Sequence, residues 1–360
     1  GISLATHDWC AYYPIAHEGG HNLDAKVFAN ALKPILELPC DKIFHNAIYD
    51  VGWLDAMGLK VNGRIVDTMV AAPLVDENRR NYSLRELSRH YVGETKSEAL
   101  LYEAAAEYGV DPKSEMWKLP PMYVGPYAEQ DAALTLRLWK HFKTELSKQD
   151  LWSIFNLESS ITPLLIEMRM RGVRIDLERA EEMSKKFHAK EMEALHKIKQ
   201  LVGSEVEIWA NASIEKAFKK LNLPYNFTEK GSPSFQQIWL EEHKHEFPQL
   251  IVKARKMNKA RTTFIDGMLM SNQQSGRIHA ELHPLRSDDG GTVTGRFSYS
   301  NPNLQQVPAR DPEIGTAIRS LFIPESKCEW GAFDYSQQEP RLVVHYAETV
   351  SYTHLTLPTR

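Results

Sequence analysis

Short apolar strands alternate with helices through the first 150 residues, and this alternation constrains the fold more than any other feature. Two strands are expected within residues 1–16 and another at 42–44. Helices are expected at 25–38, where apolar residues recur at helical spacing, and between Asn46, a favourable N-cap, and Gly58, a favourable stop. Strands and helices in alternation predict an α/β layer architecture.

The second half is predicted to be mostly helical. Residues 151–172 have helical spacing around Pro163, which predicts a kink or a restart. A long, highly charged helix is expected at 177–202, and this pattern suits both an arm projecting into solvent and an ordinary bundle helix. Shorter helices are expected at 212–222 and 234–242, and an alternating segment, 276–282, predicts a strand.

Composition narrows the class of protein. The chain has 360 residues, enough for two or three domains, and no apolar run approaches the roughly 20 residues that span a bilayer. The N-terminal residues lack the pattern of a signal peptide. Cys10, Cys40 and Cys328 lie far apart, which argues against a structural zinc site or a disulfide framework and suits a reducing cytoplasm.

The net charge is −4, so a nucleic-acid partner would have to be held by local basic patches. Residues 251–265 are such a patch, because they contain five basic side chains and no acid. They form either a solvated helix face or a phosphate-binding surface. The five are Lys253, Arg255, Lys256, Lys259 and Arg261.

An acidic residue interrupts an apolar helix face in the first half. A helix is expected to begin at Pro126, and it would place Tyr127 and Asp131 one turn apart on that face. Because an unpaired buried carboxylate is costly, Asp131 needs a partner. That partner is either an Arg or Lys, or a divalent cation shared with Asp50, in which case Tyr127 could orient a metal-bound water.

A second carboxylate follows a short apolar run, residues 330–333, which is expected to form a strand. Asp334 would then lie at the strand end, free to hold a cation. Ser336 and Glu339 form the S-x-x-E pattern that often begins a helix, and Pro340 is expected in its first turn.

The motif Asn46-x-x-x-Asp50, the triplet Asp67-Thr68-Met69 and the motif Tyr127-x-x-x-Asp131 together resemble DEDD-type 3′-5′ exonucleases in the variant that has a tyrosine. The proofreading domain of DNA polymerase I-like enzymes belongs to this group. The resemblance implies a ribonuclease-H-like fold and two metal ions. The D-x-E motif of the family is expected before Gly1, so two of its four metal carboxylates are expected to be missing from this chain.

The string T-x-T-G-R-F-S at 292–298, followed by P-N-L-Q-Q-V-P at 302–308 and by the stretch around Asp334, resembles the palm of family A DNA polymerases. The resemblance implies that Asp334 binds both catalytic metals with the backbone carbonyl at Tyr335 assisting. It also implies that Glu339 contacts the sugar of the incoming nucleotide, unless Glu339 serves only as a helix cap.

By the same resemblance, Arg296 reaches the primer terminus in the minor groove, and the long helix and basic patch form a thumb that grips the duplex backbone. Gln338 and Pro340 replace residues that are usually apolar, a variant associated with bacteriophage enzymes. The fingers helix and the second palm carboxylate are expected beyond the end of the chain.

The predicted fold class is α/β: a ribonuclease-H-like exonuclease domain at 1–148, then a mostly helical thumb and an incomplete α+β palm at 149–349. Residues 350–360 are expected to be a non-native, adapter-derived tail. The predicted function is DNA-directed DNA polymerase with 3′-5′ proofreading exonuclease, in a fragment inactive alone. The alternatives are a stand-alone exonuclease and a non-catalytic DNA-binding module.

The expected cofactor is Mg²⁺, two ions per active site, with Mn²⁺ as an alternative. The expected partners are primer-template DNA and deoxynucleoside triphosphates, for a monomer in the cytoplasm of a bacterial or phage-infected cell, with no membrane. The predicted site residues are Tyr127, Asp334 and Glu339 for catalysis; Asp50, Asp131 and Asp334 for metal; Asn46, Lys253, Arg255, Lys256, Lys259, Arg261, Thr294, Arg296, Asn303 and Gln305 for DNA; and Tyr335 and Glu339 for nucleotide.

Overall fold

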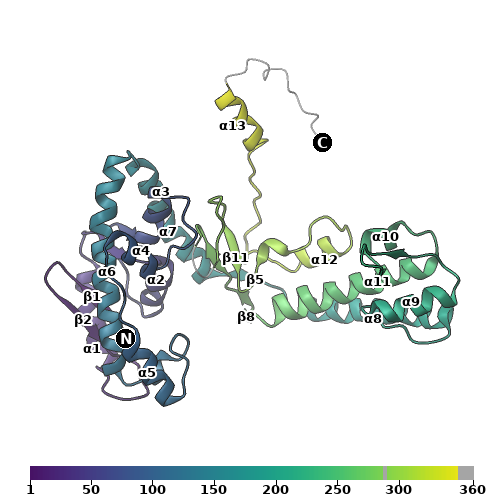
Figure 1. The fold of residues 1–360 in the computed structure, drawn as a ribbon, viewed down its shortest axis with the longest axis horizontal. Coiled ribbons are helices and arrows are strands. Elements are labelled where there is room, and N and C mark those ends of the chain that lie inside the picture. The colour runs from purple at the N-terminus through teal and green to yellow at the C-terminus, as the bar shows by residue number, and fades with distance from the viewer. Residues whose placement is uncertain (287–289, 348–360) are drawn as a thin grey trace. The chain divides into compact units, whose positions relative to one another are not determined.

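The computed structural model describes residues 1–286 and 290–347 and divides the chain into two units (Figure 1). The first unit is Gly1–Phe322 and the second begins at Ile323. The segment 350–360, expected to be a non-native tail, lies outside the described residues. No helix among the described residues is long and apolar enough to cross a membrane.

The first unit begins with two small sheets. Strands β1 (Ile2–Ala5) and β2 (Cys10–Tyr13) form an antiparallel hairpin, whereas β3 (Lys42–Phe44) and β4 (Ile65–Asp67) pair in parallel. Helix α6 (Pro121–Lys148) packs against β1, β2 and β3. Strands covered by helices confirm the predicted α/β class.

The two helices expected at 25–38 and between Asn46 and Gly58 are present and begin and end close to the predicted residues. Ser83 caps α4, as its side chain accepts a hydrogen bond from the backbone N–H of Glu86. Helix α6 is different, because it begins at Pro121 rather than at Pro126. Pro126 lies inside α6 and has no backbone N–H to donate to the carbonyl of Met122, four residues earlier. Met122 is exposed, so water can take the place of that donor. The other helices are α1 (Ala25–Leu36), α2 (Ala47–Ala56), α3 (Thr68–Val75), α4 (Leu84–Tyr91), α5 (Ala99–Tyr108) and the 3₁₀ turn Met116–Lys118.

The inner face of α6 supplies the core of this region. Leu134, Leu138 and Phe142 are almost completely buried there, against side chains from α3, α4 and α7. The face of α6 that carries Tyr127 and Asp131 is therefore anchored by its apolar neighbours one and two turns further on.

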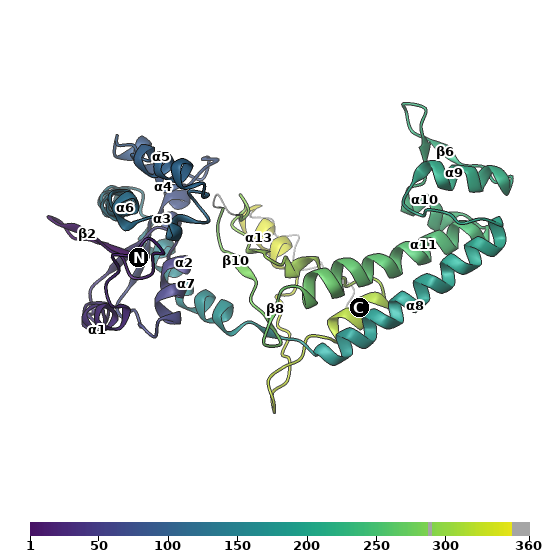
Figure 2. The ribbon, with the colours of Figure 1, turned by 90° about the horizontal axis from the view of Figure 1, so that it is seen from below.

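The rest of the first unit is mostly helical, as predicted. Helix α8 (Leu177–Val202) matches its predicted bounds, is capped by Asp176, and packs along α11 (Figure 2). Helix α7 (Trp152–Arg171) runs through Pro163 without a restart. The remaining helices are α9 (Asn211–Lys220), α10 (Gln237–Glu242), α11 (Glu246–Lys259), a π-helix (Ala260–Met270), the 3₁₀ turn Leu304–Gln306 and α12 (Ile314–Arg319).

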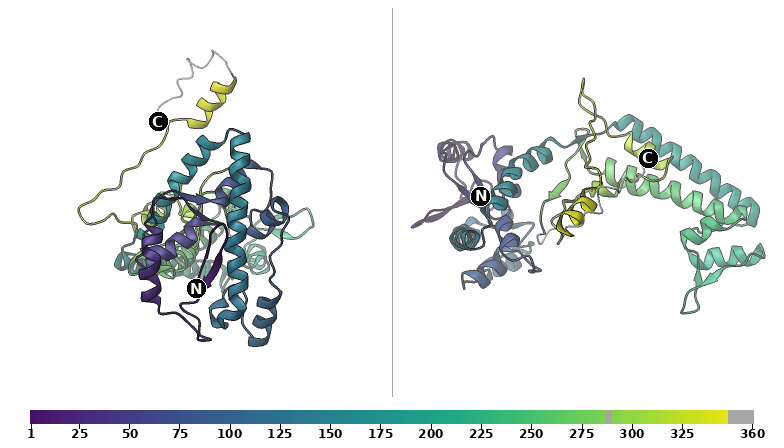
Figure 3. Two further views of the ribbon diagram at one scale, coloured as in Figure 1. Left: turned by 90° about the vertical axis from the view of Figure 1, so that its left-hand side faces the viewer. Right: turned by 90° about the horizontal axis from the view of Figure 1, so that it is seen from above.

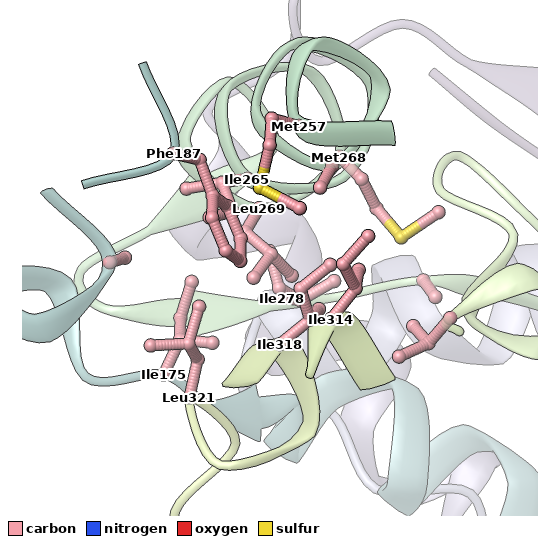
Figure 4. Packing of buried hydrophobic residues seen from close by; sticks show 14 residues of the cluster. Ile175, Phe187, Met257, Ile265, Met268, Leu269, Ile278, Ile314, Ile318 and Leu321 are labelled. Carbon is pink, nitrogen blue, oxygen red and sulfur yellow. The ribbon is translucent and has the colours of Figure 1, made fainter. Parts of the chain in front are cut away.

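The single strand expected at 276–282 is split in two. Its first part pairs in a three-stranded antiparallel sheet of order β5-β9-β8, and its second part, β10, pairs with β11. The core beneath β9 gathers side chains from α8, α11, the π-helix and α12 (Figure 4). The strands are β5 (Val173–Arg174), β6 (Asn226–Phe227), β7 (Pro233–Ser234), β8 (Gln273–Gln274), β9 (Arg277–Ile278), β10 (Glu281–His283) and β11 (Ser298–Ser300).

The described part of the second unit contains helix α13 (Gln338–Ala347), shown in two further views in Figure 3. Pro340 lies in its first turn, as predicted. The expected strand at 330–333 is wrong, since these residues have extended or irregular backbone and Phe333 is 98% exposed. A strand needs a neighbouring strand to satisfy its backbone groups, and none is paired here among the described residues.

Candidate functional site

One buried carboxylate organises the first candidate site. Asp67, at the end of β4, accepts hydrogen bonds from the backbone N–H groups of Asn46 at 3.0 Å, Ala47 at 2.7 Å and Met69 at 2.8 Å. It therefore caps both α2 and α3. Asn46 lies at the N-cap of α2 as predicted, but its side chain makes no capping bond, because Asp67 already takes that role. Burial raises the pKa of Asp67, and the bonds from the backbone N–H groups oppose this.

The cap positions Asp50 on the first turn of α2. Burial, and after it the negative charges of Asp67 and Asp131, raise the pKa of Asp50 to about 7. The structure thus brings Asp50 and Asp131 close enough for their charges to interact. A site of this kind favours a proton or a cation, because either one relieves the repulsion between carboxylates.

Asp131 has a lysine partner. Lys96 Nζ lies 2.8 Å from Asp131 Oδ2 and 2.7 Å from Oδ1, and its side chain is only 9% exposed. The same nitrogen lies 3.4 Å from the hydroxyl of Tyr127 and 4.9 Å from the centre of its ring. Of the two partners that the sequence left open for Asp131, the structure therefore shows the lysine.

Electrostatics distinguish the members of this cluster. Burial raises the pKa of Asp131, whereas the charge of Lys96 and its hydrogen bond lower it. Burial, followed by the charge of Asp131, raises the pKa of the Tyr127 hydroxyl, so that it stays protonated. Tyr127 is thus available as a hydrogen-bond donor one turn before Asp131.

The donor chemistry of this cluster fits a divalent cation in part. Asp50 and Asp131 supply carboxylate oxygens, the ligands that Mg²⁺ and Mn²⁺ take in proteins. Within residues 1–286 and 290–347, however, no group of three or more His, Cys, Asp or Glu side chains is arranged to hold a metal ion. Asp50 and Asp131 would hold such an ion in competition with Lys96.

The polar loop of the second half is surface-exposed at its predicted contact residues. Thr294, Arg296 and Gln305 are exposed, and Gln305 Nε2 donates to the carbonyl of Phe297 at 2.9 Å. Asn303 caps the 3₁₀ turn by accepting from the backbone N–H of Gln305 at 3.1 Å. The loop therefore has a defined shape and still exposes side chains that can donate hydrogen bonds.

The predicted polymerase carboxylate lies in the second unit. Asp334, Tyr335 and Glu339 are all exposed, with Tyr335 at 80%. Glu339 occupies the second position of α13, where an acid is favourable beside the N-terminal end of the helix dipole.

The basic patch divides into inward and outward side chains. Arg255 Nε donates to the carbonyl of Ile208 at 2.7 Å and Nη1 to that of Phe235 at 3.1 Å. Lys256 pairs with Glu241 at 3.0 Å and lies 3.8 Å from Asp311. These contacts join α11 to its neighbours within the protein.

Arg261 also points inward. Its guanidinium contacts Glu191 at 3.3 Å and Asp266 at 3.2 Å. Lys253 and Lys259, by contrast, are exposed. Alternation of this sort follows from helix geometry, because a run of basic residues on one helix covers more than one face.

Sequence reasoning missed the role of Asp67 and missed Lys96 altogether. Asp67 was part of a recognised triplet, and its position between a strand and a helix was a usable signal for a cap. Lys96 lies in the loop 92–98, where the sequence has no helical or strand spacing of apolar residues from which its position could be predicted. Only the three-dimensional structure could place it beside Asp131.

Two family models match most of the chain. Residues 2–147 match a 3′-5′ exonuclease family, and residues 177–354 match DNA polymerase family A. A DNA-directed DNA polymerase of Pseudomonas phage M6 is 37% identical over 96% of this chain and 54% of that protein. DNA polymerase DpoZ of Salmonella phage PMBT28 is 32% identical over 85% of this chain and 53% of that protein. The chain thus spans about half the length of these two curated relatives.

A solved structure of the POL domain of Pol1 from M. smegmatis, in complex with DNA primer-template and dNTP, has a similar fold. Its TM-score is 0.68 at 24% identity, and the match covers 91% of this chain and 54% of that one. With an exonuclease region in its first half and a polymerase region in its second, the chain belongs to the family A DNA polymerases.

Proposed function

We propose that this sequence acts in a DNA-directed DNA polymerase with 3′-5′ proofreading activity, in which residues 1–148 trim the 3′ end and residues 149–349 form the thumb and part of the palm. The observation that carries the first activity is the convergence of Tyr127, Asp131 and Asp50, from two different helices, on one partly buried acidic site. The order of the two matched families along the chain supports the second activity.

Both reactions are proposed to be phosphoryl transfers that use two Mg²⁺ ions per site, with Mn²⁺ as a substitute. The ions would polarise the phosphodiester and ionise the attacking oxygen. In the first site, the carboxylates of Asp50 and Asp131 would coordinate the cation and balance its positive charge. The Tyr127 hydroxyl, protonated because of its raised pKa, would orient the attacking water through a hydrogen bond.

In the polymerase region, Asp334 would hold metal, Tyr335 would assist through its carbonyl, and Glu339 would contact the nucleotide sugar. Thr294, Arg296, Asn303 and Gln305 would contact DNA through hydrogen bonds to sugar, phosphate and base edges. Among the basic patch, Lys253 and Lys259 are the residues we propose for phosphate contacts, because they are exposed. Asn46 stays in the proposed exonuclease set as a contact to the DNA strand.

The proposed partners are primer-template DNA and deoxynucleoside triphosphates, and the proposed state is a monomer in the cytoplasm of a bacterial or phage-infected cell. A two-site test uses the polymerase that carries this sequence. Asp131→Ala is expected to abolish trimming of a labelled 3′ end while primer extension survives, and Asp334→Ala is expected to do the reverse. Loss of both activities in either variant, with the fold intact by circular dichroism, would contradict two separate sites.

A further inference from the structure

Lys96 is the cation of the acidic site in this structure. Its ammonium lies within 2.8 Å of both oxygens of Asp131, at the place where a divalent cation would have to approach that carboxylate. Lys96 donates a hydrogen bond to Oδ2, whereas Oδ1, although close to the ammonium, accepts no hydrogen bond. The positive charge therefore faces the carboxylate as a whole while one oxygen keeps its lone pairs. A metal ion therefore meets a competing positive charge.

The position of Lys96 is built rather than accidental. The side chain of Gln130, the neighbour of Asp131, accepts from the backbone N–H of Ser97 at 2.7 Å and donates to the carbonyl of Thr95 at 3.2 Å. The side-chain amide of Gln130 thus holds the backbone on both sides of Lys96 against helix α6 through two hydrogen bonds. An ion pair of Glu94 with Arg137, also on α6, holds the same loop.

The surroundings of Lys96 make its charge effective. With a side chain 9% exposed, the ammonium is poorly screened by water, and the aromatic face of Tyr127 lies 4.9 Å away. The charge of Lys96 also reaches His45, whose pKa is lowered to about 3 by burial and then by that charge, so that His45 stays neutral and does not repel the ammonium.

We propose that Lys96 is an internal counter-ion that competes with the divalent cation for Asp131, so that metal loading of the exonuclease site requires the ammonium to leave this carboxylate. The proposal rests on the proposed exonuclease function of this site. Its consequence is regulatory. In the absence of metal the ammonium of Lys96 neutralises Asp131, and the site becomes active only when the metal concentration is high enough to displace the ammonium from this carboxylate.

The competing explanation is that Lys96 is only a structural ion pair. Removing it would then lower stability and leave the affinity of the site for metal unchanged or reduced. Competition predicts the opposite direction for metal affinity, because loss of the ammonium frees the carboxylate. The sign of the change in metal affinity therefore separates the two.

The experiment measures Mn²⁺ binding by electron paramagnetic resonance and isothermal titration, in the polymerase that carries this sequence. Binding that is lost in Asp131→Asn defines the site. Lys96→Met is expected to raise Mn²⁺ affinity at this site about tenfold, the scale of one charge-assisted hydrogen bond. Lys96→Arg, which keeps the charge, is expected to stay near wild type. Lys113→Met, which removes an exposed lysine elsewhere in residues 1–148, serves as the control.

An unchanged or weaker affinity in Lys96→Met would overturn the proposal. Should Lys96→Met not fold, Gln130→Ala provides the second test, because it releases the loop on both sides of Lys96 and is expected to raise affinity severalfold; no rise would equally overturn it. If Asp131→Asn loses no Mn²⁺ site at all, the proposed exonuclease function fails, whereas a site lost in Asp131→Asn but unaffected by Lys96→Met refutes the counter-ion alone.

Discussion

Arg261 tests whether the basic patch binds DNA as a whole or divides into structural and contacting residues. Its guanidinium joins the buried Glu191 on α8 to Asp266 on the π-helix, at 3.3 and 3.2 Å. In Arg261→Ala, Glu191, whose side chain is 9% exposed, loses a charged partner and keeps a hydrogen bond from Asn258 Nδ2 at 2.7 Å. Asp266, 41% exposed, recovers water, so its lost contact counts little.

The magnitude follows from one poorly solvated, charge-assisted contact. Hydrogen bonds to charged groups contribute about 1.5–3 kcal/mol, and a carboxylate left buried adds to the loss. We therefore expect Arg261→Ala to lower the free energy of unfolding by about 2–3 kcal/mol. Urea unfolding followed by circular dichroism measures this, and a double-mutant cycle with Glu191→Gln isolates the pair.

The matched control is Lys259→Ala, two residues away and exposed. We expect it to change the free energy of unfolding by less than about 0.5 kcal/mol and to reduce the salt dependence of duplex binding by about one phosphate contact. Arg261→Ala should leave that salt dependence unchanged. The reasoning is refuted if Arg261→Ala reduces the salt slope as Lys259→Ala does and costs less than about 0.5 kcal/mol of stability.

Three further predictions concern the acidic site. The pKa of Asp50 is about 7 in the folded state, above its value of about 3.9 in unfolded chains. Between these two values the folded state holds a proton that the unfolded state has lost, so the free energy of unfolding falls as pH rises from about 4 to 7. Asp50→Asn should remove this pH-dependent loss of stability, which amounts to up to about 4 kcal/mol at pH 8. Urea unfolding at pH 4.5 and pH 8 measures the difference, and a variant with the pH dependence of the wild type would contradict the prediction. Asp67→Asn should lower the free energy of unfolding by about 1–3 kcal/mol, because an amide has only one acceptor oxygen for the backbone N–H groups at the N-termini of two helices. Thermal unfolding measures this change, and an unchanged stability would contradict the prediction. Tyr127→Phe should slow 3′-end trimming roughly a hundredfold with extension unaffected, in a single-turnover assay, and equal slowing of both would point to a folding defect.

The sequence predicted those elements whose residues carry a local signal. The bounds of α8 follow from its cap at Asp176 and its helical spacing, and the hairpin, β3 and α2 follow from short apolar runs bounded by turns and caps. The strand expected at 330–333 failed because a strand depends on a partner elsewhere, which propensity cannot supply.

The candidate site was predictable where its residues share one helix or, like Asp50, belong to a motif that carries the family resemblance. Tyr127 and Asp131 follow from a spacing of four, whereas Lys96 comes from a separate loop and Asp67 acts through backbone groups some 20 residues earlier in the chain. The split of the basic patch likewise required knowledge of what packs on α11. Arg255 and Lys253 have the same charge in the sequence, but only one faces other protein atoms.

The shared cap at Asp67 has a consequence for how Asp50 is held in place. The contact between the end of β4 and the start of α2 fixes the first turn of α2, and with it Asp50, directly through a side chain. The segment 57–64, which connects α2 to β4, has contacts of its own, since Leu59 is buried and the backbone N–H of Asn62 donates to the carbonyl of Leu36. Asp67 thus ties the placement of the Asp50 carboxylate to β4 independently of the chain connection between the two elements.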